Sequence, residues 1–388
     1  MASFRIRHLR TINELNDYKK KWEILEVADE SSSIFQSWEW NHQWCKDVLP
    51  TLKRARIDVQ IIEDEENNIL AILPFFETSM AGAAVKLIQF IGHRMSFHND
   101  VLLVNPKSTE LAKQVLSTLI KGIGPRSIMH LRHLNADSVF TKQLLVNNQA
   151  QIQCPRILIE ADPLIEDQLL RLRRSTRKKF RYKRNRLRRE FEVKFHIRKG
   201  NDFPDAFDEL IELHHKRFSE KKRSTLLVGP ALKFLRNITS KLSNTGAFEI
   251  LQVQANGITI GAKLAAIDKE HYCSIMGGFD PEFGRFSLGK LMEFKQIRRG
   301  FDELKCKACD FGPGYELHKF DWGPNTNIRN YFCCIGGRGF YAKLMATIYC
   351  MIFKYKLPTI PNYKVNDHVT TNKPSVKSID SDLHNQKA

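Results

Sequence analysis

Residues 271–322 read HYCSIMGGFDPEFGRFSLGKLMEFKQIRRGFDELKCKACDFGPGYELHKFDW. An apolar, strand-forming run opens the stretch, and the Gly-containing turn 284–289 leads into apolar residues at helical spacing. Gly300 stands where a glycine ends a helix, and a second strand-like segment leads to Asp310, two glycines and Lys319. This order predicts a crossover whose turn presents N–H groups at a helix N-terminus, a position that favours phosphate. An ordinary crossover with turn glycines fits equally well, because no nucleotide-binding fingerprint is present.

Length and charge narrow the class of protein. The chain has 388 residues, of which 61 are Lys or Arg and 43 are Asp or Glu, so its formal net charge is +18. This length predicts two or three domains, and 42% apolar with 27% charged residues is typical of a soluble globular protein. The positive excess favours acidic partners such as nucleotide phosphates, RNA or an anionic membrane surface, without choosing among them.

Cysteine usage and hydropathy bear on location and on metals. The eight cysteines are scattered, mostly inside apolar runs, which is typical of buried, reduced thiols in a cytoplasmic protein. Cys306 and Cys309 form a close pair without the further ligands that zinc needs, so no metal is predicted. No run of about 18 apolar residues occurs, and the N-terminus resembles a first strand, so neither a transmembrane helix nor a signal peptide is predicted.

A dense basic run follows a break at Asp162-Pro163. Residues 171–189 hold twelve basic residues and no acidic one, with apolar residues at helical spacing. They predict a helix that packs along one narrow stripe and is either solvated elsewhere or bound to RNA, anionic lipid headgroups or a nucleotide. Arg181, Arg184 and Arg188 share one face, which is predicted to point away from the packed stripe and to contact the polyanion.

The remaining patterns organise the rest of the chain. Helix and strand patterns recur before and after the break, which indicates a weak internal repeat of about 170 residues. Three tryptophans lie within seven positions, from Trp38 to Trp44. They fit either a stacking platform or a buried core, and the helix-forming residues that flank them favour the core. Residues 340–356 predict a terminal helix that packs on the core or, alternatively, touches a membrane surface.

Six motifs, in the order in which they occur, resemble the CelD/BcsL-like group of GNAT-fold acyltransferases, large chains similar to the FemAB peptidyltransferases. The resemblance covers most of residues 5–350, and the last two motifs are its specific part. The motifs are Phe35-Gln36-Ser37-Trp38 to Trp44, Phe97 to Leu102, Ser175-Thr176-Arg177 with the basic helix, Leu213-His214-His215-Lys216-Arg217-Phe218, Phe286-Ser287-Leu288-Gly289-Lys290-Leu291, and Asp310-Phe311-Gly312-Pro313-Gly314 to Lys319.

The resemblance implies an α/β (α+β) fold of two tandem GNAT-like domains, each a mixed, mostly antiparallel sheet with flanking helices. The expected domains are 1–165 and 166–357, with the acyl-donor site in the second, and a disordered tail over 358–388. The implied activity is an acyl-CoA-dependent N-acyltransferase without a metal, acting on an amine such as an amino sugar or nucleotide sugar for surface polysaccharide. The expected location is the cytoplasm, with peripheral attachment to a membrane as an option.

Two alternatives stay open at this point. One is a FemAB-type transferase that takes its group from aminoacyl-tRNA, which the basic helix favours because an RNA donor needs many phosphate contacts. The other is a non-catalytic module that binds a polyanion through the same helix. The oligomeric state is not predicted.

The resemblance also implies the site residues. Asp310 is the candidate base or amine holder and Lys319 the candidate partner of the oxyanion or of a donor phosphate, so replacing either should lower transfer about 10²-fold. Their structural alternatives are a turn cap and a surface ion pair. The candidates for binding the donor are Phe286, Ser287, Leu288, Gly289 and Lys290, and those for binding the substrate are Trp38, Asp100, Arg217 and Tyr315.

Overall fold

The computed structural model describes residues 4–79, 85–146, 151–218, 228–314, 316–323 and 329–356. They fall within the unit 1–358, and residues 359–388 form a second unit. The predicted disordered tail therefore lies outside the described residues.

The helices of the described residues include those predicted over the basic run 171–189 and over residues 340–356. They are α1 (Ile12–Asp17), α2 (Lys19–Ala28), α3 (Trp38–Asp47), α4 (Thr109–Gly122), α5 (Val139–Val146), α6 (Arg174–Glu190), α7 (Phe203–Phe218), α8 (Gly229–Ser243), α9 (Leu288–Arg298), α10 (Leu317–Phe320) and α11 (Phe340–Lys356). Local chemistry explains their bounds, as α4 shows. Ser108 caps its first turn by accepting from the N–H of Leu111, and the side chains it buries, such as Ala112, Val115 and Leu119, recur at helical spacing.

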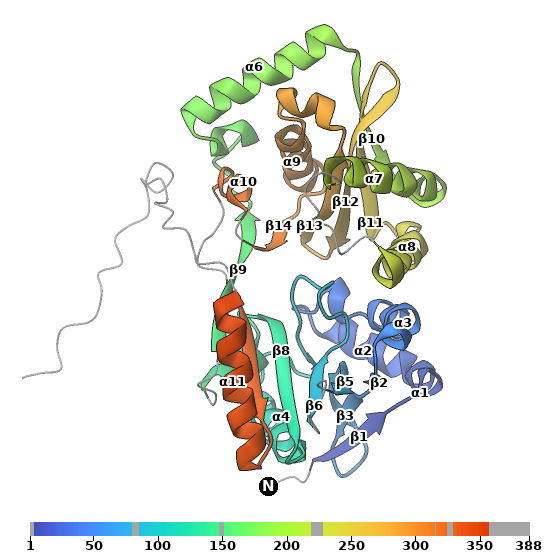
Figure 1. Cartoon of the computed structure of the whole chain (residues 1–388), viewed down its shortest axis with the longest axis vertical. Coiled ribbons are helices and arrows are strands. Elements are labelled where there is room, and N and C mark those ends of the chain that lie inside the picture. Colours follow the sequence, from blue (N-terminus) through green and yellow to red (C-terminus); the bar gives the residue numbers. More distant parts are fainter. Residues whose placement is uncertain are drawn as a thin grey trace, which may run out of the picture. The chain divides into compact units, whose positions relative to one another are not determined.

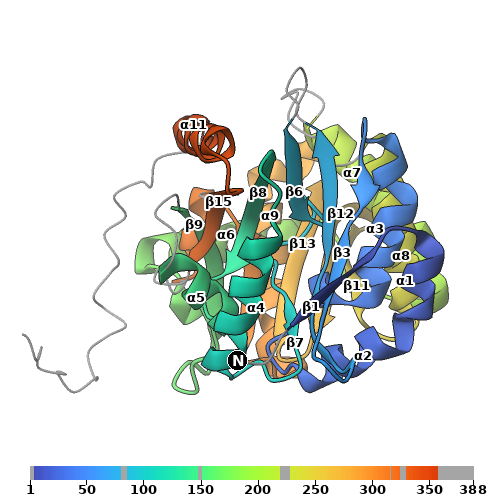
Figure 2. The same ribbon diagram turned by 90° about the horizontal axis from the view of Figure 1, so that it is seen from below.

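The strands build two sheets (Figures 1 and 2). They are β1 (Arg5–Leu9), β2 (Arg56–Ile57), β3 (Val59–Glu63), β4 (Ile69–Leu73), β5 (Phe75–Ser79), β6 (Lys86–Phe90), β7 (Leu102–Leu103), β8 (Ser127–Asn135), β9 (Gln151–Glu160), β10 (Val193–Arg198), β11 (Phe248–Ala255), β12 (Ile258–Asp268), β13 (His271–Phe279), β14 (Ala308–Pro313) and β15 (Arg329–Gly336). Within the described residues, one sheet has four strands, β1-β3-β4-β7. The other has eleven, in the order β10-β11-β12-β13-β14-β9-β15-β8-β6-β5-β2.

Most neighbouring strands pair antiparallel, and two pairs, β6 with β8 and β13 with β14, are parallel. Each parallel pair is separated in the chain by a helix, α4 in the first case and α9 in the second. This mixed, mostly antiparallel arrangement with flanking helices confirms the predicted fold class.

Two strands join the first part of the chain to the second. Strand β9 pairs with β15 over residues 151–155 and with β14 near its other end. Strand β15 in turn pairs with β8, although about 200 residues separate the two in the chain. The division at residue 165 stays a prediction, and these pairings show that strands on either side of it cross over to complete one continuous sheet.

One hydrophobic core also runs across both parts. It contains Trp40 of α3 and Phe234 of α8, whose rings meet edge to face with centroids 4.9 Å apart. Polar contacts accompany it: the N–H of Ile34 donates to Asp268 over 2.9 Å, and Nζ of Lys269 donates to the carbonyl of Asp29. Trp38, Trp40 and Trp44 are all buried, which confirms their interpretation as core residues.

Helix α11 packs as a terminal helix on β15 and β8, with Ala346 and Cys350 in the shared hydrophobic cluster. This confirms the predicted core packing for one of its faces. Among the described residues, none of the helices has the length and hydrophobicity that crossing a bilayer requires.

Candidate active site

Strands β13 and β14 part after three residue pairs. Parallel pairing joins His271 to Ala308 and ends where Cys273 pairs with Asp310. Beyond that point β14 pairs on its other side with β9, and β13 continues along β12 after a bulge at Ile275. We call this point of separation the strand fork. Bulges often re-aim backbone groups beside active sites, and the parting strands leave polar groups of β13 without a strand partner on the β14 side.

Asp310 lies at the base of the strand fork and is fully buried. Its Oδ2 accepts a hydrogen bond from Nε of Arg156 at 2.7 Å, and its Oδ1 accepts one from the N–H of Gly312 at 2.7 Å. Burial alone would lower the pKa of Arg156, but the charge and hydrogen bond of Asp310 outweigh it, so that pKa is raised. The bond to Gly312 is that of an Asx turn, which matches the turn-cap alternative. The role of Asp310 as a base stays a prediction.

Lys263 crosses the strand fork. It pairs in register with Gly277, where a Cβ would lie only 2.7 Å from Cγ of Lys263, so the glycine lets the lysine side chain pass over β13. The Nζ of Lys263 lies 5.5 Å from the ring centroid of Phe311 on β14. Burial, together with the charges of Arg217 and Lys319, lowers the pKa of Lys263 to about 8, although the charge of Glu293 opposes the shift. This amine can therefore change its protonation state near neutral pH.

Glu293, His318 and Trp322 form a polar group beside Lys263. Oε1 of Glu293 lies 3.3 Å from Nε2 of His318, and its Oε2 accepts a hydrogen bond from Nε1 of Trp322 at 3.0 Å. Burial lowers the pKa of His318 despite the opposing charge of Glu293, which favours the neutral imidazole near pH 7. The carboxylate lies beside the imidazole, and a neutral imidazole can accept a proton, as general-base chemistry requires.

The two predicted lysines near α10 both have carboxylate partners. Nζ of Lys319 lies 2.9 Å from Oε2 of Glu316 and donates to the carbonyl of Pro313, and Nζ of Lys290 pairs with Asp321. The charge of Lys319 is nevertheless close enough to lower the pKa of Lys263. The structure thus brings Lys319 to the strand fork, and its catalytic role stays a prediction.

The predicted donor-binding residues surround the start of α9. Ser287, in the left-handed conformation with φ of 57°, precedes the helix, and no side chain caps its first turn. The N–H groups of that turn have no partner inside the helix and are available to an anion. Phe286 and Leu288 are buried, so in this conformation they offer backbone groups, and Gly289 lies against the ring of Phe279. Their binding roles stay predictions.

The predicted function of Gly300 as a helix-ending glycine is wrong. Helix α9 ends at Arg298 and continues into a π-helical turn, Arg299–Glu303, in which Gly300 has no positive φ. A Cβ on Gly300 would lie 2.7 Å from Sγ of Cys309 and 3.0 Å from Cβ of Tyr272. The glycine is therefore needed for close contact between helix and sheet, which local sequence does not reveal.

The predicted substrate-binding residues lie in different places. The guanidinium of Arg217 stacks on Phe279 at 4.4 Å, close enough to Lys263 to lower its pKa. Trp38 stacks on His42 inside the first part of the chain. Asp100 is buried and accepts from the N–H of Val101, and burial raises its pKa to about 7. Tyr315 lies outside the described residues. The structure therefore brings Arg217 to the strand fork. Trp38 and Asp100 instead contact residues of the first part of the chain.

Three residues of this site were missed from the sequence: Lys263, Glu293 and His318. A signal existed for two of them, because Lys263 interrupts the apolar run ITIGAKLAAID and Glu293 interrupts the apolar face of α9. A charged residue inside a buried run needs a partner, and such a residue is a candidate for function. His318 directly precedes Lys319 and carries no comparable signal.

Comparisons with known proteins identify one domain of the chain and solved structures of similar fold. Residues 174–320 match the family model described as an acetyltransferase (GNAT) domain, so the chain contains a domain of that kind. No curated protein matches the chain in sequence. The crystal structure of FemX is similar with a TM-score of 0.56 and 11% identity, over 84% of this chain and 96% of that one.

Two further solved structures are similar. The C-terminal domain of a protein named as a lysylphosphatidylglycerol synthetase from Agrobacterium fabrum has a TM-score of 0.51 at 11% identity, covering 88% of this chain and 96% of that one. A conserved protein of unknown function from Bacteroides thetaiotaomicron has a TM-score of 0.50 at 12% identity, covering 86% and 100%. At these identities the likeness shows the fold alone.

Proposed function

We propose that this protein is an N-acyltransferase that takes its acyl group from acyl-CoA at the strand fork. The observation that carries the proposal is the parting of β13 and β14 directly beside the start of α9, with the side chain of Lys263 crossing between the strands. The fork exposes strand backbone to an extended chain, and the uncapped helix start suits the donor's phosphates. The match of residues 174–320 to a GNAT domain supports the same assignment.

The proposed reaction is direct attack of an amine on the thioester carbonyl. A C–N bond forms, the C–S bond breaks, the thiol of coenzyme A leaves, and the amine loses one proton. His318, held by Glu293, accepts that proton, because its lowered pKa keeps it neutral near pH 7. Lys263 opposes the negative charge that develops on the carbonyl oxygen, with Lys319 nearby. Holding both substrates together supplies much of the acceleration.

The acceptor that we propose is an amino sugar or a nucleotide sugar used for surface polysaccharide. This part rests on the resemblance to the CelD/BcsL-like group. Arg217, stacked on Phe279 beside the fork, is the described residue best placed to contact an acidic acceptor.

A second candidate is transfer from aminoacyl-tRNA. The observation that favours it is α6, whose cations are mostly exposed and would suit an RNA backbone. A module that binds a polyanion without catalysis is the third candidate.

Ligand-induced stabilisation separates these candidates. The melting temperature of the full chain is measured with acetyl-CoA, with longer acyl-CoAs and with tRNA in parallel, since a ligand that binds the folded state raises it. We expect a rise with acyl-CoA and release of free coenzyme A when an amino-sugar acceptor is added. A rise with tRNA alone would overturn the proposal in favour of the second candidate, and binding without any transfer would favour the third.

A further inference from the structure

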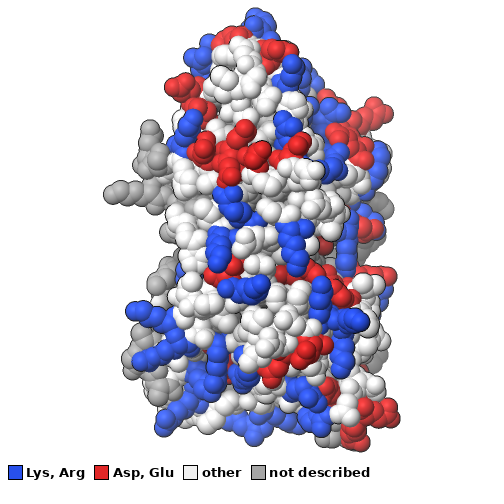
Figure 3. Space-filling model, turned by 90° about the vertical axis from the view of Figure 1, so that its right-hand side faces the viewer, with Lys and Arg blue, Asp and Glu red and all other residues white. Residues whose placement is uncertain are grey.

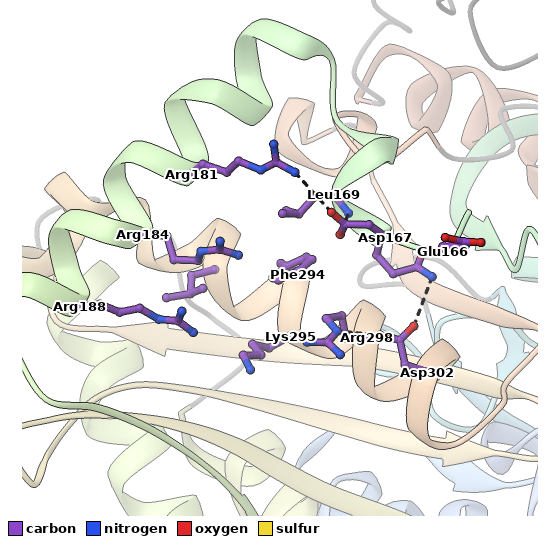
Figure 4. A pocket seen from close by; sticks show the side chains of 12 residues that line it. Glu166, Asp167, Leu169, Arg181, Arg184, Arg188, Phe294, Lys295, Arg298 and Asp302 are labelled. Carbon is purple, nitrogen blue, oxygen red and sulfur yellow. Dashed lines mark hydrogen bonds and ion pairs between the residues drawn. The ribbon is translucent and has the colours of Figure 1, made fainter. Parts of the chain in front are cut away.

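A pocket of about 340 Å³ lies between α6 and α9 (Figure 4). Five cationic side chains line it: Arg181, Arg184 and Arg188 from α6, and Lys295 and Arg298 from α9. Its apolar lining includes Phe294. Around α7 and α8, basic and acidic side chains are intermixed (Figure 3).

The prediction that the three arginines of α6 point away from its packed stripe is wrong. Successive residues of a helix are about 100° apart around its axis. This spacing places the three arginines directly beside the buried Phe180 and Leu187 on the helix surface. Because Phe180 packs on Phe294 with ring centroids 5.7 Å apart, this edge of α6 is turned toward α9. The pocket therefore collects cations that a free helix would spread into solvent.

Ion pairs neutralise only part of this charge. Arg181 pairs with Asp167 at 3.4 Å, and Arg298 pairs with Asp302 at 2.7 Å. Among the described residues, Arg184, Arg188 and Lys295 have no acidic partner. Nε of Arg184 is buried without a hydrogen-bond partner. Arg184 and Lys295 are half-buried and Arg188 is exposed, so their like charges repel one another in a partly desolvated place, and an anion between the helices would offset that repulsion.

The pKa values of two pocket residues agree with this picture. Burial and the charges of Arg188 and Arg181 lower the pKa of Arg184. Burial and the charges of Arg298 and Arg188 lower the pKa of Lys295. The three unpaired cations therefore repel one another across the pocket.

We propose that the pocket between α6 and α9 binds a terminal phosphate or diphosphate group of a small ligand. Arg184 and Arg188 lie one turn apart and present guanidinium groups from one side, with Lys295 on the facing helix, so a compact dianion can contact all three. Three acids also line the pocket, Glu166, Asp167 and Asp302, and they would repel the long phosphate backbone of an RNA more than a compact group held between the cations.

This site is distinct from the proposed donor site. The pocket uses residues from Leu291 to Arg298, which follow the first turn of α9, and the donor phosphates are proposed to lie at that first turn. The proposal therefore does not depend on acyl-CoA being the donor.

Calorimetric titration of the full chain with pyrophosphate and with inorganic phosphate tests the site. We expect the double variant Arg184→Gln/Arg188→Gln to bind pyrophosphate at least about 10-fold more weakly, the effect of losing two charge-assisted contacts. The control, Lys178→Gln/Arg189→Gln, removes two exposed charges from the opposite face of the same helix and should bind as the wild type does. Acetyl-CoA binding should be the same in all three proteins.

Three outcomes would overturn the proposal. They are no binding of either probe to the wild type, equal weakening in the two double variants, and loss of acetyl-CoA binding in the pocket variant, which would make the pocket part of the donor site. Two other arms identify the natural source of the group. A nucleotide diphosphate that displaces pyrophosphate indicates a small ligand, whereas a short RNA that displaces it more strongly would contradict the compact ligand proposed here.

A different observation concerns α11. Its outer face exposes Phe340, Leu344, Ile348, Met351 and Ile352, each between 36% and 83% accessible. They recur at three- to four-residue spacing and form one apolar stripe. Contiguous exposed apolar stripes on soluble folds mark interaction surfaces.

The charge around α11 indicates the kind of surface. No Asp or Glu occurs from residue 322 to residue 366, a stretch with six Lys or Arg residues. Two of them, Arg338 and Lys343, are exposed at the start of the helix. We infer that α11 docks on an anionic membrane surface, with its apolar stripe at the headgroup boundary and its cations facing acidic lipids.

Co-sedimentation of the full chain with phosphatidylcholine vesicles, with and without phosphatidylglycerol, tests this inference. We expect binding that requires the anionic lipid and falls several-fold in Leu344→Ser/Met351→Ser. The control, Ile24→Ser/Val27→Ser, removes two exposed apolar side chains from α2 and should bind normally. Wild-type protein that ignores anionic vesicles, equal loss in both variants, or a dimer that only the α11 variant disrupts would each overturn it.

Discussion

The two parallel strand pairs have the same topology and different surroundings. Strands β6 and β8 pair over three residues, as β13 and β14 do. Where β6 and β8 part, a loop of the chain fills the space between them. Asn99 of this loop forms a parallel bridge to Leu134, its N–H donates to the carbonyl of His133 at 2.7 Å, and its side chain donates to the carbonyl of Arg132. Backbone groups that would be left unpaired there are satisfied by the loop.

The second pair is left open on the corresponding side. Strand β13 leads through a short turn straight into α9, so a helix start and the side chain of Lys263 occupy the region that a loop fills in the first pair. The comparison teaches that the parallel pair alone does not make a site. What matters is the segment that follows the first strand of the pair. In β6–β8 it supplies hydrogen-bond partners to the backbone groups of the parting strands, whereas in β13–β14 it leaves those groups and the N–H groups of a helix start available to a ligand.

The largest expected effect tests the open pair. His318→Ala should lower kcat/KM for acyl transfer by about 10²- to 10⁴-fold, because the proposed base is lost, while the protein stays folded. Steady-state kinetics over a range of pH would measure this, and the acidic limb of the wild-type profile should disappear in the variant.

His196→Ala on β10 is the matched control and should keep full activity, since His196 contacts Gln254 away from the fork. Activity of His318→Ala within a few fold of the wild type would assign the base to another residue.

The variant Asp310→Asn tests whether Asp310 stabilises the strand fork or takes part in catalysis. Arg156 would keep its buried charge without a carboxylate, so we expect the free energy of unfolding to fall by about 3–5 kcal/mol. Urea denaturation with circular dichroism measures it. A variant of wild-type stability that has lost transfer about 100-fold would instead support the catalytic role that the resemblance implies.

Asn99→Ala tests the closed pair. It removes the side-chain bond to the carbonyl of Arg132 and should lower the free energy of unfolding by about 1–2 kcal/mol. Transfer at a temperature where the variant is folded should not change. A loss of activity comparable to that of His318→Ala would show that the first strand pair also serves the reaction, and the contrast drawn between the pairs would fail.

The smallest effect concerns Asp100, in the same loop. Because burial raises its pKa to about 7, the folded state keeps a proton that the unfolded chain loses at lower pH. The contribution of this group to stability should therefore fall as the pH rises from about 4 to about 7. Asp100→Asn removes this dependence, so the variant should gain about 1 kcal/mol relative to the wild type at pH 7 compared with pH 6. Parallel stability curves for the two proteins between these pH values would contradict the assignment.

The sequence by itself determined most of the local structure. The helices predicted over the basic run 171–189 and over residues 340–356 are observed as α6 and α11. Their apolar residues repeat at helical spacing, and a helix needs only hydrogen bonds between near neighbours. The resemblance likewise predicted the GNAT domain that residues 174–320 match.

Strands whose partners are distant were harder to predict. β10 and β15 were both missed. β10 is an edge strand that buries little, and β15 pairs with β8 and β9, which lie far away in the chain. A short apolar segment does not specify its own partner, since pairing depends on the register and burial of residues outside any local window.

Only the tertiary structure decided the composition of the site. Lys263 reaches Phe311 because Gly277, on another strand, has no side chain in its path. His318 meets Glu293 because α10 returns beside α9, and the arginines of α6 face a pocket because Phe180 turns that helix toward Phe294. Each of these contacts joins residues that no local pattern relates, and packing across strands and helices sets their distances and the pKa values that follow from them.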